Sequence, residues 1–310
     1  MSNLANRLQL RDLRLIEAIS VTGQLALAAE RLSMTQPAAS RLLAAIEQTI
    51  GSRLFLRHPK GMTPTAVGEV LARNAAAILN DLDETLREVD AVGLGRAGTV
   101  RVGAVTGAAV AFVVPAVRQL KRDALGADVH VDVAPSDALI DGLMRGEYDF
   151  VLSRVPPGTD ARQFSIRRGR VESISFLVRS GHPLACGKNP DLDELAGYEL
   201  VIQASHTPMR QAVEEAFVNR HVPLPKEIVN TTSLLVMIAY LASSNAIAPV
   251  SREVAELFGP AGIGSTLQVI SIDDPIIVHP YHLISRRNHV ISPLAARLRS
   301  LVFAGLSDGE

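Results

Sequence analysis

The stretch QLALAAERLSMTQPAASRLLAAIEQTIGSRLFLRHPKGMTPT, residues 24–65, decides the fold of the first part of the chain. Its first apolar residues recur at three- and four-residue spacing, which predicts a short helix with one buried face, made of Leu25, Ala28, Ala29 and Leu32. Ser33 and Met34 interrupt this pattern. Thr35 can then cap a second helix by accepting a hydrogen bond from a free backbone N–H of its first turn, where proline is tolerated.

The second helix is predicted to bury one face and to expose another. Its inward side should carry Ala38, Leu42, Ala45, Ile46 and Ile50, and its outward side Gln36, Ala39, Ser40, Arg41 and Leu43. This is the layout of a helix-turn-helix unit, whose second helix contacts base edges in the major groove of DNA. Two ordinary core helices followed by a surface hairpin are the alternative that the pattern alone leaves open.

A basic hairpin is predicted after the second helix. The segment LFLR, residues 54–57, reads as a strand, and His58-Pro59-Lys60-Gly61 reads as a turn. A wing of this kind would carry its cations towards DNA phosphates. The candidate DNA-contacting residues of the two elements are Thr35, Gln36, Pro37, Ser40, Arg41, Arg53, Arg57 and Lys60.

This region closely resembles the N-terminal signature of the LysR-type bacterial transcription regulators. The resemblance rests on AAERLSMTQPAASR at 28–41, IE at 46–47, GSRLFLR at 51–57 and TPTAVGE at 63–69. It implies an all-α winged helix-turn-helix domain over residues 1–65 that binds double-stranded DNA. It also implies a linker and dimerisation helix over 66–93, assembly into a homodimer or homotetramer, and RNA polymerase as a candidate partner.

The distribution of charge agrees with a DNA-binding N-terminal part. The 310-residue chain has a net charge of −1. Residues 1–74 hold nine basic and five acidic residues, a net +4, whereas residues 75–95 hold one basic and five acidic residues, a net −4. Positive charge is therefore concentrated where phosphate attraction is needed. Because +4 is modest, we expect two or more copies to bind DNA together.

A long helix is predicted from Thr65 to about Val92. Its apolar positions alternate four and three residues apart, which is typical of a two-stranded coiled-coil seam, at Leu71, Ala75, Ile78, Leu82, Thr85, Val89 and Val92. An amphipathic helix lying on its own domain is the alternative. The next residues, GLGRAG at 93–98, match the dinucleotide fingerprint, but they follow a helix and precede a strand. We therefore interpret them as a linker, because the fingerprint must follow a strand.

Strands and helices alternate beyond this linker, which predicts a mainly parallel sheet covered by helices. A second unit of the same kind begins near Arg170, and a late segment is expected to return to the first. The sequence thus predicts a two-lobed α/β domain with a cleft over residues 94–310. Lobe I should span about 94–162 and 268–310, and lobe II about 163–267.

The second part of the chain resembles the type-2 periplasmic-binding-protein-like effector domain of LysR-type regulators. The resemblance rests on GAVTGAAV at 103–110, PSDALIDGLMRGEYDFVLSR at 135–154, VRSGHPL at 178–184, LAGYELVI at 195–202, AVEEAF at 212–217 and IAPVSREVAELF at 247–258. Within the family it is most similar to the branch that contains the galactose-binding-protein regulator. It implies a small-molecule effector, of the sugar or organic-acid class, bound between the lobes.

Polar residues after strands and before helices are the candidate effector ligands, because ligands of α/β sheets bind beyond the carboxyl ends of strands. These candidates are Thr106, Ser136, Arg154, Ser205, His206 and Thr232, together with Gly107, which would permit close backbone approach to a ligand. Helix capping alone would also explain the Ser and Thr positions. A structural salt bridge would equally explain Arg154.

No catalytic motif is found in the sequence, which has no GxSxG, HExxH, CxxC or phosphate-binding loop. We therefore expect neither an enzyme nor a cofactor or metal. The single cysteine, Cys186, and the lack of an apolar export signal or membrane-spanning run predict a cytoplasmic protein. The rival hypothesis is a solute-binding module or small-molecule enzyme with an N-terminal interaction domain.

Overall fold

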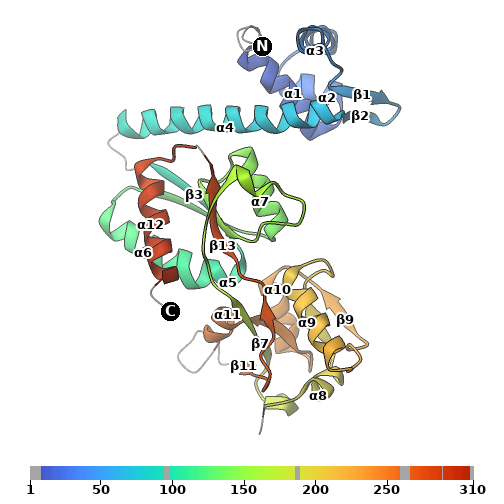
Figure 1. Cartoon of the computed structure of the whole chain (residues 1–310), viewed down its shortest axis with the longest axis vertical. Coiled ribbons are helices and arrows are strands. Elements are labelled where there is room, and N and C mark those ends of the chain that lie inside the picture. The colour runs from blue at the N-terminus through green and yellow to red at the C-terminus, as the bar shows by residue number, and fades with distance from the viewer. Residues whose placement is uncertain (1–7, 94–97, 186–188, 259–265, 288, 308–310) are drawn as a thin grey trace. The chain divides into compact units, whose positions relative to one another are not determined.

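The computed structural model describes residues 8–93, 98–185, 189–258, 266–287 and 289–307 (Figure 1). The chain divides into two compact units, one built mainly from the residues before 100 and the other from most of the rest. Most of the predicted linker and Cys186 lie outside the described residues. No helix within the described ranges is long and apolar enough to cross a membrane.

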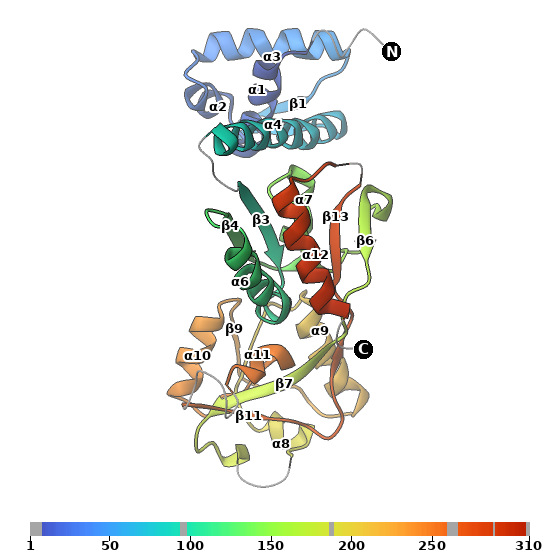
Figure 2. The ribbon, with the colours of Figure 1, turned by 90° about the vertical axis from the view of Figure 1, so that its left-hand side faces the viewer.

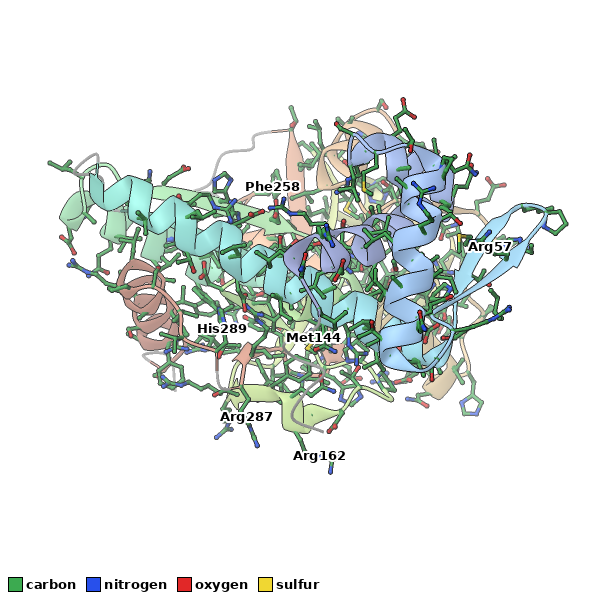
Figure 3. The ribbon with its side chains drawn as sticks, turned by 90° about the horizontal axis from the view of Figure 1, so that it is seen from above. Arg57, Met144, Arg162, Phe258, Arg287 and His289 are labelled. Atoms are coloured by element: carbon green, nitrogen blue, oxygen red, sulfur yellow. The ribbon has the colours of Figure 1, made fainter. Side chains whose placement is uncertain are left out.

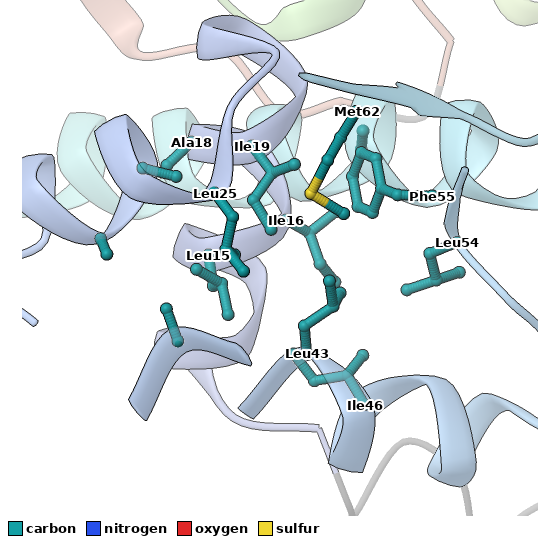
Figure 4. Close-up of a cluster of buried hydrophobic side chains, with 14 residues drawn as sticks. Leu15, Ile16, Ala18, Ile19, Leu25, Leu43, Ile46, Leu54, Phe55 and Met62 are labelled. Carbon is teal, nitrogen blue, oxygen red and sulfur yellow. The ribbon is translucent and has the colours of Figure 1, made fainter. Parts of the chain in front are cut away.

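The first unit consists of packed helices and a two-stranded hairpin. Its elements are α1 (Leu10–Thr22), α2 (Leu25–Arg31), α3 (Gln36–Ile50), β1 (Phe55–His58), β2 (Gly61–Pro64) and α4 (Ala66–Gly93). Apolar side chains from α1, α2, α3 and the hairpin form one core, which includes Leu15, Ile16, Leu43 and Phe55 (Figure 4). The predicted helix-turn-helix with a wing is confirmed.

The buried face of α3 differs from the prediction. Ala39, Leu43 and Ile46 are buried, whereas Ala45 is exposed and Leu42 is only half-buried. The placement of Ala39 and Leu43 on the outward side is therefore wrong. The stripe 38, 42, 45 has the same spacing as the stripe 39, 43, 46, but it is turned by one residue, about 100° around the helix. Periodicity in a helix rich in alanine and leucine does not distinguish the two.

Close backbone contact holds the wing against the end of α1. The Met62 N–H donates to the Gly23 carbonyl oxygen at 2.7 Å. Gly61 has a φ of +141°, and a Cβ there would overlap the same carbonyl oxygen. Only glycine fits this position, so the direction of the wing is fixed by the sequence.

Helix α4 begins inside the first unit and extends beyond it. Leu71 and Ala75, two predicted seam residues, pack in the core of their own domain, because α1 lies along the first half of α4. The amphipathic alternative is therefore correct for this half. Further along, Ile78 is 48 % exposed and Val89 is 63 % exposed. Exposed apolar side chains therefore occur on both halves of α4, at Val67 and Val70 near its start and at Ile78, Leu86 and Val89 in its second half.

The second unit contains two lobes, each with its own sheet (Figure 2). Lobe I has a five-stranded sheet in the order β4-β3-β5-β13-β6. Its strands are β3 (Thr99–Ala104), β4 (Asp128–Val133), β5 (Phe150–Ser153), β6 (Phe164–Arg167) and β13 (His282–Arg286). Its helices are α5 (Thr106–Ala108), the π-helical η1 (Ala109–Val113), α6 (Val114–Asp123), α7 (Ser136–Arg145) and α12 (Pro293–Ser307), with α6 and α12 side by side.

Lobe II is organised around the long strand β7. Its strands are β7 (Glu172–Arg179), β8 (Leu200–Ile202), β9 (Ile228–Asn230), β10 (Ala248–Ser251), β11 (Leu267–Ile270) and β12 (Ile277–Val278). Strand β7 pairs antiparallel with β10, β11 and β12, and β8 pairs parallel with β9. Its helices are α8 (Leu192–Ala196), α9 (Pro208–Asn219), α10 (Leu234–Ala242) and α11 (Arg252–Glu256), and a 3-10 turn lies at Pro183–Ala185. Another 3-10 turn, Ala161–Gln163, directly precedes β6 in lobe I.

Two expectations about the lobes need correction. The sheet of lobe I is mixed rather than mainly parallel, because the returning strand β13 runs antiparallel to both β5 and β6. The lobe boundaries also shift: β6 pairs with β13 in lobe I, and β11 pairs with β7 in lobe II. The boundaries expected at 163 and 268 therefore lie further along the chain, after β6 and after β11. Both strands have only four residues, which give too little alternation of apolar and polar residues to be recognised.

Candidate DNA-binding surface and interlobe cavity

The first turn of α3 presents a compact set of polar groups. The Thr35 hydroxyl accepts a hydrogen bond from the Ala38 N–H at 3.4 Å and so caps the helix as predicted. Gln36, Pro37 and Arg41 are exposed, and Ser40 is half-buried. The core-facing side of α3 is formed by Ala39, Leu43 and Ile46. Gln36, Pro37 and Arg41 lie on its solvent-facing side.

The wing is fixed to the same helix by a residue that the sequence analysis missed. The Glu47 Oε1 atom accepts hydrogen bonds from the backbone N–H groups of Leu54 at 2.8 Å and Phe55 at 3.3 Å. Near the tip of the wing, the Arg57 Nη2 atom donates to the Ser40 hydroxyl at 3.2 Å (Figure 3). The arginine of the wing and the polar turn of α3 therefore form one surface.

A hollow of about 330 Å³ lies between the wing and helices α2 and α3. Gln36, Arg57 and Lys60 line it among the predicted residues, together with Gln24 and His58. Arg53 is exposed at the start of the wing. The structure thus brings Arg57, Lys60 and Gln36 together around one hollow, whereas Arg41 and Arg53 are exposed and do not line it.

A second cavity, of about 200 Å³, lies between the two lobes of the second unit. Five of the predicted effector residues line it, namely Thr106, Gly107, Ser136, Arg154 and Thr232. Ser205 and His206 do not line the cavity and are exposed. They lie in the turn before α9, and the buried Thr207 takes the position facing the cavity instead.

Helix N-termini converge on this cavity from both lobes. In lobe I, Thr106 is the first residue of the helical segment that continues through α6, and Ser136 is the first residue of α7. In lobe II, α9 begins at Pro208 and α10 at Leu234. All four residues line the cavity. Free N–H groups and the positive ends of helix dipoles therefore point towards it. Such a site favours ligand oxygens that accept hydrogen bonds.

The charged residues that line the cavity are Arg154 and Glu172, and they bind each other. The Arg154 Nη2 atom lies 2.5 Å from Glu172 Oε2, and the side chains are 12 % and 5 % exposed. The Arg154 Nε atom donates to the His279 carbonyl oxygen at 2.6 Å. The salt-bridge alternative for Arg154 is therefore correct, and the wall of the cavity carries no net formal charge.

Gly107 permits a close approach of lobe I to lobe II at this wall. A Cβ on Gly107 would lie 2.5 Å from the Ser251 Oγ atom and 2.9 Å from the Glu172 Oε1 atom. Any larger side chain would push the Glu172 carboxylate or α11 aside. The glycine that the sequence suggested for close backbone approach to a ligand thus already meets protein atoms of lobe II.

Behind the wall lie two more ionisable groups, Glu253 and Tyr281, whose pKa values are raised by burial. Burial raises the pKa of the Glu253 carboxyl above its ordinary value, and the charge of Glu172 raises it further. Burial likewise raises the pKa of the Tyr281 hydroxyl, and the charges of Glu253 and Glu172 add to the effect. Within the described ranges, the Glu253 Oε2 atom and the Tyr281 hydroxyl have no hydrogen-bond partner.

Several lining residues could not be recognised in the sequence. They are Glu172, Gln203 and Ser251, whereas Thr207 and Thr231 also line the cavity and are direct neighbours of predicted residues. Glu172 and Ser251 lie at the ends of strands that pair with each other across lobe II, and no local motif marks them. Among the described residues, the Thr106 and Thr232 hydroxyls and the Gln203 amide make no hydrogen bond and are available to a ligand.

Comparison with known proteins agrees with this geometry. Residues 10–69 match the model of the bacterial regulatory helix-turn-helix protein of the lysR family, and residues 94–306 match the LysR substrate binding domain. The transcriptional regulator GbpR of Rhizobium radiobacter is 37 % identical over 246 residues, 79 % of this chain and 82 % of GbpR. GbpR of Azospirillum brasilense is 32 % identical over 291 residues, 94 % of this chain and 84 % of the relative.

Solved structures show the same fold over the whole chain. The LysR family regulator CbnR has a TM-score of 0.66 at 22 % identity and covers 97 % of this chain and 100 % of its own. Full-length CbnR bound to its target DNA has a TM-score of 0.64, also at 22 % identity, and covers 96 % and 100 %. The matched relatives are transcription regulators, not enzymes or solute-binding modules. The chain belongs to the LysR family of bacterial helix-turn-helix transcriptional regulators.

Proposed function

We propose that this regulator reads operator DNA with the first turns of α3 and changes its DNA binding when a small polar metabolite occupies the interlobe cavity. The observation that carries the proposal is the surface in which Arg57 of the wing donates to Ser40 of α3. Gln36, Ser40 and Arg41 would contact base edges, and Arg53, Arg57 and Lys60 would hold phosphates. The domain division 1–65, 66–93 and 94–310 is part of the same proposal.

Replacing Gln36 and Ser40 by alanine should remove sequence preference. Each lost base contact costs roughly 1–3 kcal/mol of discrimination. The measurement is selection of bound duplexes from a random-sequence library by the full chain, followed by titration of the enriched sequence against a scrambled one. Lys60→Gln should instead weaken both duplexes alike and lower the salt slope by about 0.9.

Gln48→Ala is the matched control, because Gln48 is an exposed glutamine in the second half of the same helix. It should leave the enriched sequence unchanged. If the variant with Gln36→Ala and Ser40→Ala still prefers the enriched duplex over the scrambled one, α3 does not read the bases through this turn.

The proposed effector is a small polar metabolite of the sugar or organic-acid class. Free Thr106, Gln203 and Thr232 groups and the converging helix N-termini supply hydrogen bonds to its oxygens. The Arg154 guanidinium is already paired with Glu172, so it is not free to bind a carboxylate of the ligand. The Glu172 carboxylate can accept a hydrogen bond from a ligand hydroxyl. These two features favour a neutral ligand rich in hydroxyl groups, such as a sugar, over an acid.

The proposed assembly is a homodimer paired through the second half of α4, with further pairing into a homotetramer. An isolated DNA-binding unit with modest positive charge binds weakly, and two linked units gain affinity because the second contact becomes intramolecular. The regulator would act in the cytoplasm, where bacterial DNA lies. RNA polymerase is the proposed protein partner, because a regulator bound at an operator can alter the binding of polymerase to the neighbouring DNA.

A further inference from the structure

Two segments of lobe I concentrate positive charge far from the winged helix in the sequence. Residues 161–170 and 282–307 contain eight arginines and no lysine, aspartate or glutamate, although the whole chain has a net charge of −1. These arginines are Arg162, Arg167, Arg168, Arg170, Arg286, Arg287, Arg297 and Arg299. Charge segregation of this degree in a nearly neutral chain calls for an explanation beyond solubility.

Strand pairing brings the two segments together at the edge of the sheet. Strand β6 is an edge strand that pairs with β13, and Arg286 stands opposite Phe164. The Arg287 N–H donates to the Gln163 carbonyl oxygen at 2.8 Å. Arg162 and Arg287 therefore belong to two neighbouring segments of the chain at this edge of the sheet, and both side chains point outward in Figure 3.

Helix α12 adds cations beside the same strand. The Arg167 guanidinium lies 4.8 Å from the centre of the Phe303 ring on this helix. Burial lowers the pKa of Arg299, and the positive charge of Arg167 lowers it further. The two guanidinium groups of Arg167 and Arg299 thus repel each other across β6 and α12, a cost that the contact between Arg167 and the Phe303 ring only partly offsets.

Some of the eight arginines have partners inside the lobe. Arg297 pairs with Asp123, and Arg170 donates to the Leu306 carbonyl oxygen. Asp160 pairs with Arg162, but the arginine side chain remains 87 % exposed. We define the arginine face as Arg162, Arg167, Arg287 and Arg299.

We propose that the arginine face is a second DNA contact, which binds backbone phosphates without reading sequence. This goes beyond the proposed function, which assigns DNA contacts to the winged helix alone. The partner is DNA because the family binds DNA and every duplex extends as a polyanion beyond the bases that are read. Guanidinium forks also match phosphate geometry better than lysines do. Once the winged helix is bound, the arginine face is tethered to the same DNA molecule. Its contact with phosphates is then intramolecular and occurs at high effective concentration.

The test compares salt slopes of full-length proteins on a long random-sequence duplex. The variant Arg162→Gln/Arg167→Gln/Arg287→Gln changes exposed side chains only and should lower the slope of log K against log salt by about two to three units, at roughly 0.9 per phosphate contact. On a duplex just long enough for one winged helix, the same variant should match the wild type. The matched control, Arg118→Gln/Arg122→Gln/Arg252→Gln, removes three exposed arginines elsewhere in the effector domain and should keep the wild-type slope.

Equal slopes for the two triple variants on the long duplex would overturn the proposal. A changed sedimentation coefficient of the arginine-face variant with an unchanged slope would also overturn it, because the face would then bind a protein surface instead of DNA.

Discussion

Glu172→Ala is expected to destabilise the effector domain by roughly 3–5 kcal/mol, the cost of leaving a buried charge without its partner. Arg154 would remain in the wall of the cavity with its side chain only 12 % exposed. Exchanging both residues for apolar ones of similar size, as in Arg154→Met/Glu172→Leu, should cost much less, since no charge is then left buried. Urea unfolding followed by circular dichroism measures the free energy of unfolding of each variant.

The matched control is Glu256→Ala, which breaks the pair between Arg252 and Glu256 on the surface. Both side chains there are well exposed, so the loss should lie within about 1 kcal/mol. Should Glu172→Ala cost no more than this control, the pair between Arg154 and Glu172 would be solvated. The argument that the cavity favours neutral ligands would then fail.

Ile78→Asp is expected to split the dimer and to lower operator affinity by about 10²–10⁴-fold, the gain that linkage of two binding units can supply. Ile78 is half-exposed on the part of α4 that lies beyond the core of its own domain. An aspartate there would be buried without a partner in a paired seam. Sedimentation velocity and operator titration measure the two effects.

Arg87→Asp is the control on the opposite side of α4, nine residues further and therefore turned by about 180°. It changes the charge of the helix more than Ile78→Asp does, but it should leave the dimer intact. A dimer that survives Ile78→Asp would remove α4 as the site of pairing.

The helices could be predicted almost to the residue where caps mark their ends. Thr35 caps α3, which begins at Gln36, as expected, because the capping hydrogen bond forms within one helical turn. Pro115 does not end the helix that contains it. A π-helical turn precedes it at Ala109–Val113 and absorbs the displaced backbone bonds.

The parts that could not be predicted depend on contacts between distant segments. Glu172 looks like a solvated charge at the start of a strand, yet it closes the cavity because Arg154 lies across from it. Ser205 and His206 looked as suitable as Thr207, since only the packing of the turn before α9 decides which of them faces inward. Composition and periodicity carry no information about such pairings.

The central claim is that a ligand in the interlobe cavity alters DNA binding by the winged helix. The most direct measurement is titration of a stabilising ligand into the full-length protein on its selected duplex, for the wild type and for Thr106→Val. Thr106 lines the cavity, and valine keeps its shape while removing the hydroxyl. We predict that the ligand changes wild-type affinity or footprint, and that Thr106→Val requires about 5–150-fold more ligand, the equivalent of roughly 1–3 kcal/mol for one unpaired ligand group. An identical ligand response in both proteins, or no response of DNA binding to any ligand that stabilises the wild type, would contradict the claim.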